Sequence, residues 1–141
     1  MSTDYVTLVG LFEDHSGLVN TLWGILQVVT LGLLGFVYKE EYVRRNPRIL
    51  ALLSLAFVGF ALGNQKAILR SQAVLRAVYE QLHDPQYLAT VPASLRGVLA
   101  AHQAATVAEI RQDHWILVVS VVVAVWLPYA FDRARGRSGA A

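Results

Sequence analysis

Three long apolar runs that contain no charged residue constrain this chain more than any other feature. They cover residues 17–38, 49–63 and 115–131. About 20 apolar residues in a helix span the roughly 30 Å hydrocarbon layer of a bilayer, and a lone strand cannot satisfy its backbone there. The second run is short, so we expect its helix to continue to Leu69 while Lys66 extends its ammonium group to the interface. The sequence predicts an all-α integral membrane protein with three transmembrane helices.

Composition agrees with a membrane protein and excludes several other classes. Of the 141 residues, 55% are hydrophobic and 16% are charged, whereas a soluble domain has about 25% charged residues. The chain has no cysteine, which excludes a disulfide framework and any cysteine-ligated metal site. Its net charge of +2 is too small to indicate a nucleic-acid partner. The lipid bilayer is therefore the first predicted partner.

The distribution of Lys and Arg predicts the orientation. They crowd the turn at 39–48 and the tail from residue 132, and they are sparse elsewhere; basic segments that flank spans stay in the cytoplasm. We predict a bacterial plasma (inner) membrane protein with its N-terminus outside and its C-terminus in the cytoplasm. The predicted order is an extracytoplasmic N-terminal segment (1–16), span one (17–38), a cytoplasmic turn (39–48), span two (49–66), an extracytoplasmic helical hairpin (67–113), span three (114–131) and a cytoplasmic tail (132–141).

The segment between spans two and three has a helical pattern. Apolar residues recur at seven-residue spacing, and Pro85 and Pro92 bracket the expected turn. We predict two long helices, at roughly 47–83 and 93–133, which extend spans two and three into an antiparallel hairpin. The predicted seam between them consists of Ile68, Leu75, Val78, Leu82, Leu95, Val98 and His102.

Polar residues inside the first span are candidates for function. Asn20, Gly24, Gln27 and Leu31 share one helix face, because they are spaced by four, three and four residues. Amides inside a bilayer usually join helices through hydrogen bonds, which is the interpretation that we favour here. They can instead line a pore or hold a ligand.

Small residues in the other two spans indicate close helix packing. Gly59 and Gly63 match the G-x-x-x-G pattern, and Ser120 and Ala124 form a similar small pair. Such pairs let two helix backbones approach closely. The pattern alone does not distinguish packing within one chain from association of two copies.

Two of the histidines suggest a possible haem site. His15 and His114 precede spans one and three, and two membrane histidines at equal depth can ligate haem b. Both have an acidic neighbour, Asp14 or Asp113, which favours two solvated interfacial side chains. The sequence contains no catalytic or metal-binding motif. We therefore predict no enzyme activity, no catalytic or metal site and no cofactor.

Three functional hypotheses follow from these features. The first is an interaction or accessory protein that binds a membrane-protein partner or forms a homo-oligomer, with the hairpin as its contact surface. The second is a holin-like or toxin-like pore-former, which the small size, the three spans and the basic tail favour. The third is a small haem- or quinone-associated subunit of a membrane complex.

Overall fold

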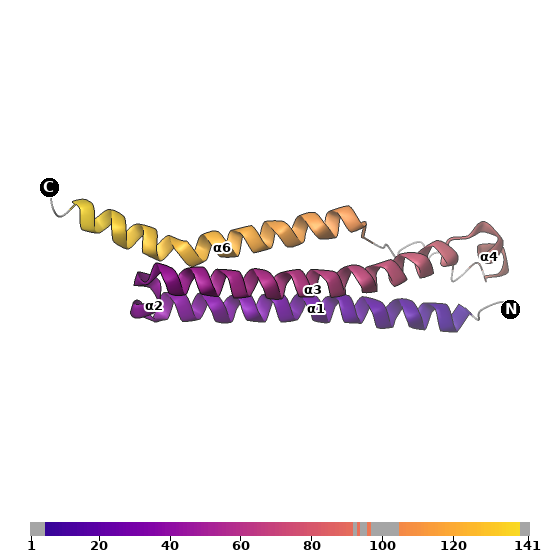
Figure 1. Cartoon of the computed structure of the whole chain (residues 1–141). Coiled ribbons are helices and arrows are strands. Elements are labelled where there is room, and N and C mark those ends of the chain that lie inside the picture. Colours follow the sequence, from indigo (N-terminus) through magenta and orange to yellow (C-terminus); the bar gives the residue numbers. More distant parts are fainter. Residues whose placement is uncertain (1–4, 92, 94–95, 97–104, 139–141) are drawn as a thin grey trace. The chain divides into compact units, whose positions relative to one another are not determined.

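The computed structural model describes residues 5–91, 93, 96 and 105–138. Every regular element among them is a helix (Figure 1): α1 (Tyr5–Lys39), α2 (Glu41–Arg45), α3 (Pro47–Leu82), α4 (Pro85–Thr90) and α6 (Val107–Ser138). α1, α3 and α6 are long and apolar enough to cross a membrane. The all-α class is confirmed, and so are three helices of spanning length and hydropathy.

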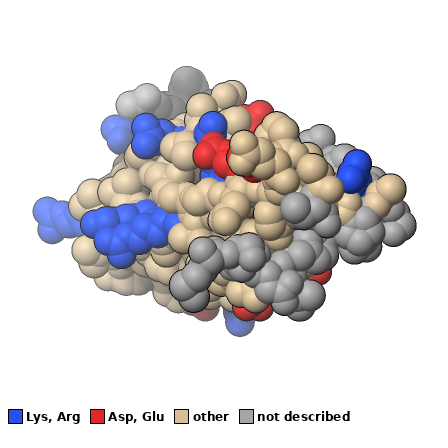
Figure 2. All heavy atoms as spheres, turned by 90° about the vertical axis from the view of Figure 1, so that its right-hand side faces the viewer, with Lys and Arg blue, Asp and Glu red and all other residues tan. Residues whose placement is uncertain are grey.

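Much of the surface that Figure 2 shows is uncharged. Lys and Arg form separate patches there, and uncharged surface lies between them. Large apolar side chains also remain exposed on the long helices: Val28, Leu31 and Leu55 have 70%, 70% and 71% of their surface accessible. A soluble monomer rarely exposes so much apolar surface, whereas lipid tails cover it without cost.

α3 begins at an Asn-Pro pair and runs without interruption for 36 residues. The Asn46 side-chain oxygen accepts hydrogen bonds from the backbone N–H groups of Arg48 (3.1 Å) and Ile49 (3.4 Å). Pro47 takes the first helical position, where its missing N–H is not needed. The helix continues through Gly63 to Leu82, as the sequence predicts.

The third long helix differs from expectation. A single helix over 93–133 is wrong, because Ala105 and Thr106 lie outside any helix and α6 begins at Val107. The cause is a capping box. The Glu109 carboxylate accepts hydrogen bonds from the Thr106 backbone N–H and hydroxyl (both 2.8 Å), and the Thr106 hydroxyl accepts one from the Glu109 N–H (3.2 Å). This reciprocal pairing satisfies amide groups that a helix start leaves without partners.

The chain forms two compact units, which are described separately below. Unit 1 comprises Met1–Trp23 and Lys66–Ile110, and unit 2 comprises Gly24–Gln65 and Arg111–Ala141. Each of the three long helices therefore contributes to both units.

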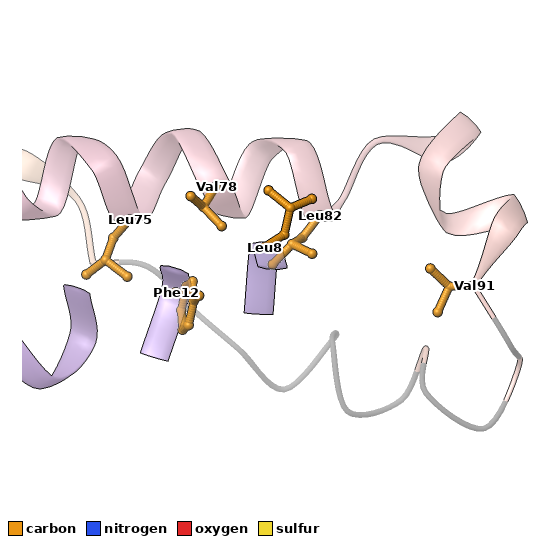
Figure 3. Packing of buried hydrophobic residues seen from close by; sticks show 6 residues of the cluster. All are labelled: Leu8, Phe12, Leu75, Val78, Leu82 and Val91. Atoms are coloured by element: carbon orange, nitrogen blue, oxygen red, sulfur yellow. The ribbon is translucent and has the colours of Figure 1, made fainter. Parts of the chain in front are cut away.

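The core of unit 1 is an apolar cluster between the first turns of α1 and the last turns of α3 (Figure 3). Leu8 and Phe12 of α1 lie against three α3 residues, and Val91 completes the cluster. The three α3 residues belong to the predicted seam. They are buried, and so is Ile68. Within the described residues their partner is α1; the remaining seam residues, Leu95, Val98 and His102, lie outside the described residues.

In unit 2 each long helix buries one stripe of side chains. The buried apolar members are Leu26 and Val37 of α1, Leu50, Phe57 and Ala61 of α3, and Val118, Val121 and Val125 of α6. Hydrogen bonds join α6 to the other helices: the Tyr38 hydroxyl donates to the Ala124 carbonyl (3.2 Å), and the Trp126 indole N–H donates to the Ser54 hydroxyl (3.1 Å).

Candidate functional site

Gly59 and Gly63 lie on an outward surface of α3 in unit 2. Both are exposed, and a Cβ atom added to either would meet nothing within 4 Å. The same part of the helix exposes Leu52 (67%) and Leu55 (71%). Among the described residues nothing packs closely against this glycine pair, and association with a second copy stays a prediction.

The presence of two glycines in the middle of α3 does not stabilise that helix. Each glycine in a helix interior costs about 1 kcal/mol relative to alanine. In return, a glycine pair leaves a shallow groove in which another backbone can lie closely. The described part of the chain places nothing in the groove at Gly59 and Gly63. Among the described residues, the space beside both glycines is therefore open to another helix.

The amides of α1 also point away from the described packing. Gln27, near the middle of the first apolar run, is exposed in unit 2, whereas its neighbours Leu26 and Thr30 are buried. Gly24 is half-buried with open space at its Cβ position. In unit 1, Asn20 is exposed as well. Within the described residues no hydrogen bond joins Asn20 or Gln27 to another helix, so the Gln27 amide is open to a partner or to water.

Ser120 and Ala124 differ in their exposure. Ser120 is exposed and Ala124 is half-buried. The Ala124 carbonyl accepts the hydrogen bond from the Tyr38 hydroxyl, so this end of the pair serves contact between α1 and α6 within unit 2.

Unit 1 contains polar contacts that sequence reasoning missed. His15 Nδ1 lies 2.9 Å from the Ser71 hydroxyl oxygen, and the Gln72 side-chain amide donates to the Ala105 carbonyl (2.7 Å). Ser71 and Gln72 are buried, with 4% and 3% of their surface accessible. A nucleophilic serine needs an accessible hydroxyl, so we assign the His15–Ser71 pair to helix packing. The signal available in the sequence was a polar pair, at 71 and 72, inside an amphipathic helix.

His114 differs from the solvated side chain that the sequence predicts. Only 1% of its surface is accessible, and it lines a narrow hollow in unit 2 with Ala61 and Leu62 of α3 and Trp115 of α6. Among the residues that the structure describes, no three His, Cys, Asp or Glu side chains are grouped to hold a metal ion. The environments of His15 and His114 do not identify a cofactor.

Comparisons with protein-family models, with curated proteins and with solved structures found no match.

Proposed function

We propose that this chain is a self-associating membrane component, and that a second copy docks on the outward face of α3 around Gly59 and Gly63. The observation that carries the proposal is the open space at both glycine Cβ positions. The seam residues of α3 are a weaker choice of contact surface, because Leu75, Val78 and Leu82 are already buried against α1. We therefore place the contact surface within unit 2 and away from the predicted hairpin.

The α3 face suits a second copy of the same chain. In a two-fold dimer the same surface meets itself, so a groove must be flanked by side chains that fit it. Exposed Leu52 and Leu55 lie one to three helical turns from Gly59 and Gly63. Helices in lipid associate through van der Waals packing and hydrogen bonds, because lipid removes the hydrophobic drive. A groove that allows close backbone contact is one of the few sources of affinity available there.

Gln27 supplies a second, polar source of affinity. A primary amide is both donor and acceptor, so the same residue of two copies can form a hydrogen-bonded pair. Such bonds contribute about 0.5–2 kcal/mol between membrane helices. Exposure of Gln27 in the single chain leaves it available for this role.

The proposed setting is a bacterial plasma membrane with the N-terminus outside. α1, α3 and α6 contain 35, 36 and 32 residues. At a rise of 1.5 Å per residue each is about 50 Å long, whereas the hydrocarbon layer is about 30 Å thick. α2 and the first turn of α3 hold Arg44, Arg45 and Arg48, which favours a cytoplasmic place for this connection.

The experiment is energy transfer between donor- and acceptor-labelled copies of the full chain in lipid vesicles. Leucine at both Gly59 and Gly63 fills the groove, and overpacking costs about 1–3 kcal/mol, so the dissociation constant should rise about 5- to 150-fold. Leucine at both Gly32 and Gly35 is the matched control. These α1 glycines are also exposed and open, but they are three residues apart and do not form the four-residue pattern. Equal transfer in all three proteins, or none in the unsubstituted chain, would reject self-association through α3.

A pore is the second candidate function, and the exposed Gln27 amide is the observation that favours it. If several copies turned this amide toward a common axis, it would line a polar path through the bilayer. Gln27→Leu keeps the approximate side-chain length and removes the polar group. A pore predicts an ion leak from vesicles that changes with this substitution. Simple association predicts no leak in either protein, together with weaker energy transfer in Gln27→Leu.

A further inference from the structure

The end of unit 2 where α2 connects α1 to α3 carries a concentration of arginine. α2 contributes Arg44 and Arg45, and the last turns of α6 contribute Arg133 and Arg135. These four residues, with Tyr129 and Asp132, line an open hollow of about 650 Å³. We name it the arginine hollow.

The arginine hollow has more positive than negative charge. Four guanidinium groups and one carboxylate line it, so its formal charge is 4 − 1 = +3. Asp132 Oδ2 lies 3.5 Å from Arg44 Nε and 3.8 Å from Arg45 Nε, so one carboxylate is shared by both. Arg133 donates to the Tyr129 hydroxyl (3.3 Å), a neutral partner. The α6 side of the hollow therefore keeps its positive charge available for an anion.

A neighbouring hollow helps to decide where an anion would bind. It measures about 690 Å³ and is lined by Glu41, Tyr42, Arg45, Asn46, Pro47 and Arg48. Its formal charge is only 2 − 1 = +1, and Glu41 already pairs with Arg45 at 2.8 Å. The arginine hollow is thus the stronger anion site of the two.

The position of the arginine hollow indicates the kind of anion. It lies beside the ends of helices of spanning length, and tyrosines and basic residues are common where such helices meet lipid headgroups. Guanidinium groups bind phosphate oxygens through paired N–H donors. Basic pockets at the ends of membrane helices suit anionic lipid headgroups. We propose that the arginine hollow binds the phosphodiester headgroup of an anionic phospholipid, with Arg133 and Arg135 as the main ligands. This inference does not depend on self-association.

A fluorescent reporter lies close to the arginine hollow. The ring centroid of Trp126 is 6.0 Å from that of Tyr129, which lines the hollow. Bromine on a lipid acyl chain quenches a nearby indole. In a full chain with Trp23→Phe and Trp115→Phe, Trp126 is the single tryptophan, since the sequence contains three. Brominated phosphatidylglycerol is titrated into phosphatidylcholine vesicles that contain this protein, and brominated phosphatidylcholine serves as the reference lipid.

Brominated phosphatidylglycerol should quench Trp126 fluorescence more strongly than brominated phosphatidylcholine does. This preference should depend on the arginines of the hollow. Each basic residue near a headgroup contributes about a five-fold preference for an anionic lipid. Arg133→Gln with Arg135→Gln should therefore reduce the preference at least about five-fold. Lys66→Gln with Arg70→Gln, two exposed residues of unit 1, removes the same charge and should keep the preference. Circular dichroism verifies that both variants remain helical.

A variant that removes a negative charge, in place of a positive one, gives an independent test. Asp132→Asn removes the one carboxylate in the hollow and should raise the preference for phosphatidylglycerol. The proposal is overturned if the unsubstituted protein shows no preference, if the two double variants behave alike, or if Asp132→Asn lowers the preference. It is also overturned if millimolar inorganic phosphate displaces phosphatidylglycerol, because the ligand would then be a free phosphate.

Discussion

Replacing Leu75 with alanine tests how unit 1 is held together. Leu75 has 4% of its surface accessible and packs in the cluster with Leu8 and Phe12 of α1. The substitution removes three carbon atoms, or about 2.4 kcal/mol at roughly 0.8 kcal/mol each. The cavity that remains adds to this loss, so the expected total is about 2–5 kcal/mol. The equilibrium constant for local opening should rise about 30-fold to about 4,000-fold.

Hydrogen exchange measured by mass spectrometry reports this opening by segment. In our account, peptides from the end of α3 and from the first turns of α1 lose protection together, because each helix covers the other. Val74→Ala is the matched control, since Val74 is the preceding residue on α3 and has 39% of its surface accessible. Its effect should stay within about 0.5 kcal/mol. Loss of protection in α3 with unchanged exchange in residues 5–15 would refute the α1–α3 contact and favour a seam against residues 93–102.

Three further predictions concern orientation, helix start and packing. A reporter enzyme that is active only outside the cytoplasm should work when fused at Pro85 and fail when fused at Ser138; the reverse pattern would overturn the orientation. Thr106→Ala removes the cap of α6 and should destabilise its first turn by about 1 kcal/mol, seen as about five-fold faster amide exchange there and not in α3. Trp126→Phe removes the donor and Ser54→Ala removes the acceptor of one hydrogen bond. A double-mutant cycle, measured on unfolding in detergent, should give a coupling free energy of about 0.5–2 kcal/mol. A coupling of zero would show that the two side chains do not interact.

The three long apolar helices could be predicted because a single chain segment in lipid must form all its backbone hydrogen bonds within itself. Charge-free runs at 17–38, 49–63 and 115–131 can satisfy their backbone in lipid only as helices. The start of α3 is equally local, since Asn46 and Pro47 carry the capping signal in their own chemistry.

Burial in unit 1 was easier to predict than the contact that causes it. The spacing of Ile68, Leu75, Val78 and Leu82 shows which face of α3 is apolar, and all four are buried. A periodic stripe does not say which segment covers it. Within the described residues the cover is α1, whose Leu8 and Phe12 are four residues apart and form a short stripe of their own. That signal lies in a segment to which the sequence analysis assigned no secondary structure.

The start of α6 was missed although its signal was present. Thr106 and Glu109 have the spacing of a capping box just before an apolar run. The abundance of helix-forming residues on either side favoured one continuous helix, and the local hydrogen bonds of the capping box prevailed. Helix propensity is a small preference summed over many residues. A capping box, in contrast, fixes the start of a helix at one position through its own hydrogen bonds.

The residues of the candidate site could be predicted from the sequence, but whether they face the inside of the chain or its surface could not. The Gly59–Gly63 pair and the Gln27 amide were identified from sequence, yet the same pattern fits packing inside the chain or between chains. Only the structure shows that both glycines face open space and that Gln27 is exposed. The direction in which a helix face points depends on every other helix, so one helix pattern cannot determine it.

Disulfide cross-linking at α3 tests self-association most directly. The chain has no cysteine, so a single Gly59→Cys substitution gives the only thiol, and a bond forms only when two Cα atoms approach within about 7 Å. Gly59→Cys should give a covalent dimer when native membranes are oxidised. Ala61→Cys, two residues away and 1% accessible, should give none. Dimers from both variants would indicate random collision, and their absence from Gly59→Cys would contradict docking of a second copy on this face.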